Sequence, residues 1–220
     1  MDAHAFDIAF ETSTRSASLA IGHAGSVSVE RLADNVAHAS DLLPLLAESL
    51  LKKGLKREHM RSVHVGLGPG SFTGLRVGCS IALGLAEGLQ VPLCGVPSIA
   101  ATAWANLQPG ERGTVVLDAR GGALYLATYL RQETGLVTER SPSRFKVADA
   151  KALELSEGIM LGESRALGIL FGEERPGYPR RADTGPDAGA LLYLGLRQME
   201  RDGATDAGDV RPLYMADFGA

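Results

Sequence analysis

Residues 8–21 read IAFETSTRSASLAI, and the same plan returns at residues 115–128, which read VVLDARGGALYLAT. Each stretch starts as a short apolar strand that ends in an acid, Glu11 or Asp118. A tight polar turn follows, and then a second strand in which apolar residues alternate. This repetition predicts an internal duplication, with two α/β lobes that face each other across a cleft.

The segments around these two stretches extend the pattern. In the first half we expect strands at 5–10, 16–21, 27–32, 63–67 and 92–96, and helices at 41–53, 72–90 and 99–106. In the second half we expect strands at 114–117, 124–130 and 158–162, helices at 164–170 and 187–201, and an exposed loop at 172–186. We place the lobes at 1–108 and 109–220, with the second lobe reduced.

The bulk composition is that of a soluble globular protein. The chain has 220 residues, of which 45% are hydrophobic and 22% charged, and its net charge is −4. This balance argues against RNA binding by the chain alone. Arg175, Arg180 and Arg181 gather around Tyr178. This group is either an ordinary solvated loop or an anion or RNA contact.

The two cysteines and the apolar segments indicate the cellular compartment in which the protein is expected. Cys79 and Cys94 cannot form a disulfide framework, and both resemble small buried hydrophobic residues in a reducing environment. The N-terminus has no basic region followed by an apolar run, so we expect no signal peptide. The apolar stretch at 77–89 is interrupted by polar residues and glycines, and we interpret it as too short and too polar to span a membrane. These features predict a cytoplasmic protein.

Two polar turns are candidates for nucleotide binding. The candidate residues are Glu11, Thr12, Ser13, Thr14, Asp118, Gly121 and Gly122. Hydroxyls and free N–H groups in such turns can wrap a phosphate, and the acids can hold Mg²⁺. The alternative is that the hydroxyls stabilise the turns locally. No further glycine pair is available for an adenosine, so the site looks incomplete. We expect no required cofactor, and weakly bound ATP or ADP with Mg²⁺ stays open.

The helix after residue 71 contains small residues at every fourth position. Gly74, Gly78, Ala82 and Ala86 form one row, and Gly84 and Gly88 belong to a second. Glycine within a helix costs about 0.5–1 kcal/mol relative to alanine, so close approach of another backbone is indicated. That backbone belongs either to this chain or to a partner that packs helices 41–53 and 72–90 into a four-helix bundle. The predicted interface residues are Leu42, Leu46, Phe72, Gly74, Arg76, Gly78, Ala82 and Ala86.

Common catalytic motifs are missing from the sequence. Residues 66–74 match neither a Walker loop nor a Rossmann fingerprint. None of the five histidines lies three or four residues from another, so no helical metal motif is present. No G-x-S-x-G elbow occurs, although a Ser-His-Asp triad assembled from distant segments stays open. We predict no catalytic residue and no metal site.

Several segments in a fixed order resemble the TsaB (YeaZ) family over most of the first 130 residues. The most specific is GPGSFTGLRVG at 68–78. The others are Glu11 to Thr14, His38-Ala39-Ser40 before Leu42, Gly95 to Ser98, Asp118-Ala119-Arg120 with Gly122 and Tyr125, and Pro212-Leu213-Tyr214.

The resemblance implies an α/β, actin-like (ASKHA, ribonuclease H-like) fold of two duplicated lobes. It also implies a non-catalytic subunit that binds and activates TsaD. TsaD transfers a threonylcarbamoyl group to the adenosine next to the anticodon of tRNAs that read ANN codons. TsaE would join the complex, tRNA would bind only through it, and the chain alone would form a homodimer.

Two other functions stay open. One is a free-standing ATPase or small-molecule kinase of the same fold, with Mg²⁺ held by Glu11 and Asp118. The other is a peptidase, which the older label M22 glycopeptidase suggests and no residue here supports.

Overall fold

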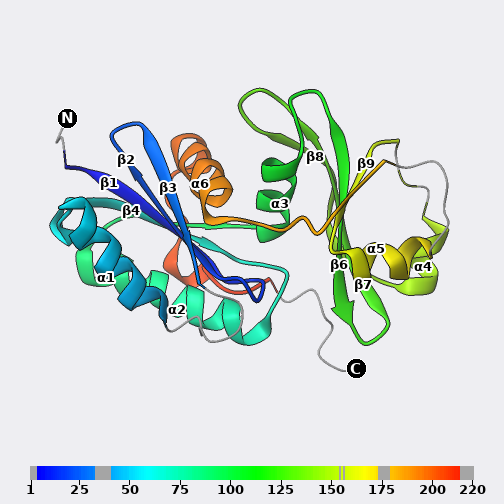
Figure 1. The fold of residues 1–220 in the computed structure, drawn as a ribbon, viewed down its shortest axis with the longest axis horizontal. Coiled ribbons are helices and arrows are strands. Elements are labelled where there is room, and N and C mark those ends of the chain that lie inside the picture. The colour runs from blue at the N-terminus through cyan, green and yellow to red at the C-terminus, as the bar shows by residue number, and fades with distance from the viewer. Residues whose placement is uncertain (1–3, 33–40, 154, 156, 173–178, 214–220) are drawn as a thin grey trace. The chain divides into compact units, whose positions relative to one another are not determined.

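The computed structural model describes residues 4–32, 41–153, 155, 157–172 and 179–213. Within these residues the chain forms two compact units, each built on a five-stranded sheet (Figure 1). Unit 1 contains residues up to Ser98 and the segment Asp187–Leu213, and unit 2 contains Ile99–Pro186.

The sheet of unit 1 has the strand order β3-β2-β1-β4-β5. Its strands are β1 (Phe6–Glu11), β2 (Ser18–His23), β3 (Ser26–Arg31), β4 (Met60–Gly66) and β5 (Leu93–Val96). The first three strands form an antiparallel meander, whereas β4 and β5 run parallel to β1. All six residues of β1 are buried, because helices cover both faces of the sheet.

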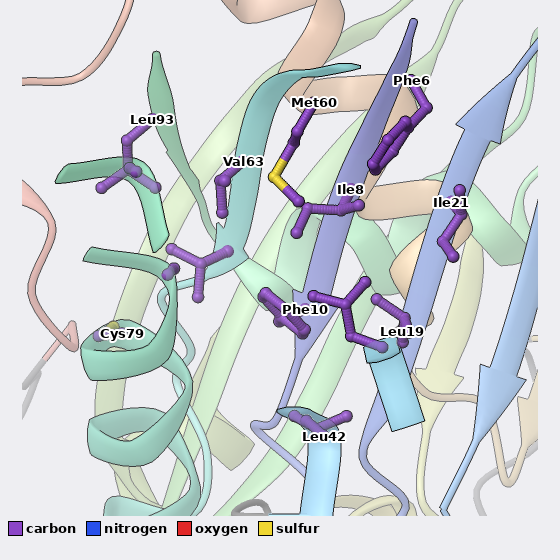
Figure 2. Close-up of a cluster of buried hydrophobic side chains, with 14 of the residues drawn as sticks. Phe6, Ile8, Phe10, Leu19, Ile21, Leu42, Met60, Val63, Cys79 and Leu93 are labelled. Carbon is purple, nitrogen blue, oxygen red and sulfur yellow. The ribbon is translucent and has the colours of Figure 1, made fainter. Parts of the chain in front are cut away.

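Helices α1 (Leu42–Lys53) and α2 (Phe72–Leu89) cover one face of this sheet, and α6 (Ala188–Asp202) packs on the same unit from the other side (Figure 1). Figure 2 shows the core beneath the sheet, where Phe10 and Leu19 lie on the same side as Leu42 of α1 and Cys79 of α2. The short helix η2 (Arg57–His59) leads into β4. Gly54 ends α1 in a left-handed conformation, as the sequence predicts.

The sheet of unit 2 has the strand order β10-β9-β6-β7-β8. Its strands are β6 (Arg112–Arg120), β7 (Ala123–Arg131), β8 (Leu136–Lys146), β9 (Ile159–Gly162) and β10 (Arg180–Ala182). Its helices are α3 (Ser98–Asn106), α4 (Val147–Ala152) and α5 (Ser164–Phe171). Val116 and Leu124 pack under α4 and α5, whereas Val115 and Ala127 pack against Ile99 of α3. Successive residues of a strand point to opposite faces of the sheet, so these contacts place helices on both faces.

The two sheets share one topology. Strands β6 to β10 repeat β1 to β5 in order and in direction, with an antiparallel meander followed by two parallel strands. This repetition confirms the predicted actin-like α/β fold of two duplicated lobes. The second repeat is reduced, since α4 and α5 have 6 and 8 residues where α1 and α2 have 12 and 18.

The units divide the chain differently from the predicted boundary after residue 108. Helix α3 follows the first five strands in sequence but belongs to unit 2, where Ile99 and Leu107 are buried. Helix α6 follows the second set of strands but packs on β1 and β2 of unit 1. The segment after α6 then lies beside β5, where Thr205 N donates to the Leu93 carbonyl at 2.8 Å. The last helix of each repeat, α3 or α6, therefore packs in the unit that the strands of the other repeat form.

Helix α2 corrects the prediction made for its apolar stretch. It is 18 residues long, and by length and composition it is apolar enough to cross a membrane. The core helix of a soluble domain passes the same test, and the inner row of α2 covers the sheet of unit 1. The expectation of no membrane contact stays a prediction.

Candidate functional site

The glycine-rich segment 68–74 packs directly on the polar turn after β1. Ser71 N donates to the Ser13 carbonyl at 2.7 Å, and Ser71 caps α2 by accepting from Gly74 N. A Cβ atom at Gly70 would lie 2.2 Å from the Ser13 carbonyl oxygen, and one at Gly74 would lie 2.2 Å from that of Thr12. Only glycine allows this approach, so the two motifs form one packed element.

Glu11 lies at the end of β1 and is fully buried. Its Oε1 accepts a hydrogen bond from Ser13 N at 2.6 Å, while Oε2 has no hydrogen-bond partner among the described residues. Burial raises the pKa of Glu11, and hydrogen bonding from Ser13 offsets part of this effect. The carboxyl therefore shapes the turn from a buried position.

The described residues of the two turns do not fit a magnesium–nucleotide complex. Thr12 is 1% exposed, and its hydroxyl faces Gly78 of α2. In unit 2, one carboxylate oxygen of Asp118 accepts from Arg120 N at 2.8 Å, and the other lies 3.3 Å from Arg165 Nε. Gly121 and Gly122 form the tight hairpin between β6 and β7 with positive φ angles. These contacts favour turn stabilisation over cofactor binding, and weak nucleotide binding stays a prediction.

A Glu11→Gln variant tests whether this carboxyl is structural. Glutamine keeps the Oε1 acceptor and cannot ionise. Because the folded pKa of Glu11 is raised, its stabilising contribution is complete below the unfolded value of 4.5 and is lost as pH rises through the folded pKa. We therefore expect Glu11→Gln to gain stability over wild type at pH 7 and to show little gain at pH 4, in urea unfolding at both pH values. A less stable variant at pH 7 would contradict this interpretation.

The row of small residues predicted as an interface faces the chain's own sheet. Ala82 and Ala86 are buried in the core of unit 1, and a Cβ atom at Gly78 would lie 2.3 Å from Thr12 Oγ1. Leu42 and Leu46 of α1 are likewise buried. The close approach that the glycines indicated is therefore intramolecular at Gly74 and Gly78. This corrects the interface prediction for Leu42, Leu46, Gly74, Gly78, Ala82 and Ala86.

The opposite side of the same two helices is exposed, and we call it the outer helical face. It includes Leu43, Ala47 and Leu51 on α1 and Phe72, Arg76, Ser80, Gly84 and Gly88 on α2, and the exposed Glu48, Lys52, Thr73 and Glu87 belong to the same two helices. Leu51 is 82% exposed and Phe72 46% exposed, and the Arg76 guanidinium stacks on the Phe72 ring at 3.8 Å. A Cβ atom added at Gly84 or Gly88 would meet no other atom within 4 Å, so the backbone there is open to approach. Of the predicted interface residues, Phe72 and Arg76 lie on this face.

Two arginines of the predicted patch, Arg180 and Arg181, contact other residues of unit 2. Arg181 forms a two-pronged ion pair with Glu111 at 2.7 and 2.8 Å and donates to the Asn106 carbonyl at the end of α3. Arg180 lies over the Phe171 ring at 5.0 Å. Arg175 and Tyr178 lie outside the described residues, as do His38, Ala39, Ser40 and Tyr214. Arg181 stabilises the fold and is not a free anion contact.

The structure brings one serine, one histidine and one aspartate together from β1 and β4. Ser62 Oγ donates to Asp7 Oδ1 at 2.7 Å and lies 2.9 Å from His64 Nε2. The serine proton is thus given to the aspartate, so the histidine is not placed as its base. Ser62 and His64 are buried beneath α6, where Gly195 packs on the histidine ring. This trio is a core hydrogen-bond network and does not support a peptidase.

Comparisons with known proteins find similarity to proteins that are named for tRNA modification. The family model described as "TsaD: tRNA N6-adenosine threonylcarbamoyltransferase" matches residues 32–168. The tRNA threonylcarbamoyladenosine biosynthesis protein TsaB of Escherichia coli is 34% identical over 132 residues, which cover 59% of this chain and 57% of that protein. TsaB of Haemophilus influenzae is 34% identical over 129 residues, covering 57% and 54%. The chain thus spans about half the length of the curated relatives it matches.

Solved structures agree with this fold over nearly the whole chain. YeaZ from Pseudomonas aeruginosa has a TM-score of 0.83 at 25% identity, and the match covers 96% of this chain and 99% of that one. A second Pseudomonas aeruginosa structure, titled as similar to peptidase YEAZ, has a TM-score of 0.84 at 24% identity, with 96% and 100% covered.

The repeated sheets and their order define an actin-like α/β protein. The family model, the curated relatives and the solved structures then identify a family within this fold. The chain belongs to the TsaB (YeaZ) family.

Proposed function

We propose that this chain is a non-catalytic subunit that binds TsaD through its outer helical face and activates it. TsaD would transfer the threonylcarbamoyl group to the adenosine next to the anticodon of tRNAs that read ANN codons. The observation that carries the proposal is the composition of α2, which is apolar enough to be a core helix although only five of its 18 residues are buried. A partner that covers the exposed side of α2 would account for apolar residues beyond those that the sheet of unit 1 buries.

The outer helical face has the physical properties of an interface. Leu43, Leu51 and Phe72 are large apolar side chains that stay exposed in the described chain. Fully burying such a side chain contributes roughly 1.5–3 kcal/mol. Gly84 and Gly88 leave a bare strip of helix backbone, against which a partner helix can pack closely. Phe72 with its stacked Arg76 resembles the aromatic and arginine anchors that dominate many interfaces.

The kind of partner follows from this geometry. A pair of helices that exposes apolar residues and bare backbone is completed by a similar pair, which yields a four-helix bundle. The TsaD family model matches this chain, so TsaD is expected to have related helices. A second copy of the chain offers the same pair, and we propose that a homodimer forms when TsaD is absent.

The remaining parts of the proposal concern the assembly. TsaE would join the complex of this chain with TsaD, and tRNA would bind only to that assembly. The complex would work in the cytoplasm without membrane contact and without a cofactor held by this chain. A free-standing ATPase is the weaker alternative, because Glu11 is buried and both oxygens of Asp118 are engaged.

Reconstitution tests the proposed function. An unmodified tRNA transcript with an ANN-reading anticodon would be incubated with threonylcarbamoyl-AMP, ATP, TsaD and TsaE of the same source, with and without this chain. We expect modification to depend on the chain, and the chain alone to hydrolyse no ATP. Equal modification without the chain would refute the proposal, and ATP hydrolysis by the purified chain would favour the ATPase.

A further inference from the structure

Three exposed cations gather at one end of the sheet of unit 2, and we call them the basic corner. They are Arg120 at the end of β6 and Arg144 and Lys146 at the end of β8. Between residues 120 and 146 the chain has five basic and two acidic residues, although its net charge is −4. The corner is therefore a local positive region on an acidic protein.

The strand register places Arg144 and Lys146 on one face of the sheet, and it brings Arg120, in the turn at the end of β6, opposite the same neighbouring strand β7. Ala123 of β7 pairs with Arg120 on one side and with Lys146 on the other, and Tyr125 pairs with Arg144. Residues directly opposite in an antiparallel sheet share a face, as do residues two apart on a strand. Neighbouring strands lie ~4.8 Å apart and residues two apart on a strand ~6.8 Å, so the Cα atoms of Arg144 and Lys146 lie about 7 Å apart and those of Lys146 and Arg120 about 10 Å apart.

Within the described residues, these cations differ from the other arginines of unit 2. Arg112 pairs with Glu139, Arg165 with Asp118 and Arg181 with Glu111. By contrast, Arg120, Arg144 and Lys146 have no ion pair with any residue that the structure describes. The corner is thus unneutralised, apart from the backbone contact of Arg120 to the already paired Asp118.

The turn that carries Arg120 adds a second observation. Arg120 has a φ of 56°, which is left-handed, and Gly121 and Gly122 follow with positive φ. A residue with a side chain costs roughly 1–2 kcal/mol in this conformation, whereas glycine does not. The Arg144 guanidinium lies beside the same turn, with Nη2 4.0 Å from a Cβ position built on Gly121. A long cationic side chain is therefore held at a strained position next to another cation.

We propose that the basic corner binds the phosphate backbone of the RNA substrate within the assembled complex. Cations about 7–10 Å apart can each contact a separate phosphate, because a nucleic-acid strand carries one negative charge per nucleotide. The half-buried Tyr125 lies on the same face beside Arg144 and offers a ring edge or face to a nucleotide. This inference rests on the proposed function, which supplies the RNA.

A triple variant, Arg120→Gln, Arg144→Gln and Lys146→Gln, tests the inference. The matched control is Lys56→Gln, Arg197→Gln and Arg201→Gln, which removes three exposed cations from unit 1. Each protein would be assembled with TsaD, and binding of the unmodified tRNA transcript would be measured by fluorescence anisotropy over a salt series. We expect the triple variant to bind about 10- to 100-fold more weakly, with a salt slope lower by about 2, because each lost phosphate contact removes ~0.7–0.9. The control should match wild type.

The outcomes separate this inference from the proposed function. Unchanged tRNA affinity and salt slope in the triple variant would overturn the proposal that the basic corner binds RNA. An equal loss of tRNA affinity in the control variant would also overturn it. A wild-type complex that binds no tRNA would overturn it as well. The single variant Lys146→Gln should lower the slope by ~0.7–0.9 and serves as a check with minimal effect on folding. If the chain fails to activate TsaD in reconstitution, the proposed function fails instead, whatever the tRNA affinity.

Discussion

A Gly84→Leu variant is expected to bind TsaD about ten- to hundred-fold more weakly while its own fold stays intact. Gly84 lies on the outer helical face, and a Cβ atom there meets nothing within 4 Å. Within the chain the leucine removes a helix-interior glycine, which should raise stability by up to ~1 kcal/mol. At the interface the same side chain holds two backbones apart, and overpacking of about 1–3 kcal/mol corresponds to that loss of affinity.

The matched control is Gly78→Leu, on the inner side of the same helix. A Cβ atom at Gly78 would lie 2.3 Å from Thr12 Oγ1, so leucine there should displace α2 from the turn after β1 and destabilise unit 1. Thermal unfolding of both variants and titration calorimetry against TsaD give the comparison. A stable Gly84→Leu variant with unchanged TsaD affinity would show that the outer helical face is not the interface.

A Gly195→Ala variant is expected to lose about 2–3 kcal/mol of stability, although alanine is the better helix former. A Cβ atom at Gly195 would lie 2.2 Å from Nδ1 of His64, whose ring is held by its contact with Ser62. The histidine has no room to move, because it is fully buried between the sheet and α6. Burial lowers the pKa of His64 to about 4, so the ring is neutral at pH 7.

The control for this prediction is Gly168→Ala in α5, where a Cβ atom meets nothing within 4 Å. Urea unfolding should show Gly168→Ala more stable than wild type and Gly195→Ala less stable. Replacing His64 by alanine should remove most of the extra cost of Gly195→Ala in a double-mutant cycle. Additive effects of the two substitutions would mean that Gly195 is required for another reason.

The first half of the fold could be predicted from the sequence because its signals are local. The leucine stripe of α1, the stop at Gly54 and the alternation in β2 act within a few residues of one another. The repeated plan at 8–21 and 115–128 then revealed the duplication. Strand β8 was missed, since it is mainly exposed, contains Pro142 and lacks a clean alternation. The short helix α4 and strand β10 were missed as well.

The orientation of α2 shows where sequence patterns stop being informative. Two rows of small residues were visible, but a helical period does not say which row faces the sheet. Gly78 faces inward because the turn at Thr12 lies against it, and that contact joins residues far apart in sequence. The exchange of α3 and α6 between the units is likewise set by distant contacts, such as that of Gly195 with His64. The basic corner also depends on strand register.

Activation of TsaD through the outer helical face is best tested by a titration. The rate at which TsaD with TsaE modifies an ANN-reading tRNA transcript would be measured against the concentration of wild-type chain and of Gly84→Leu. We expect a saturable rise with wild type, and the same plateau reached at about ten- to hundred-fold higher concentration with the variant. A rate that does not depend on the chain, or identical curves for the two proteins, would contradict the proposed activation.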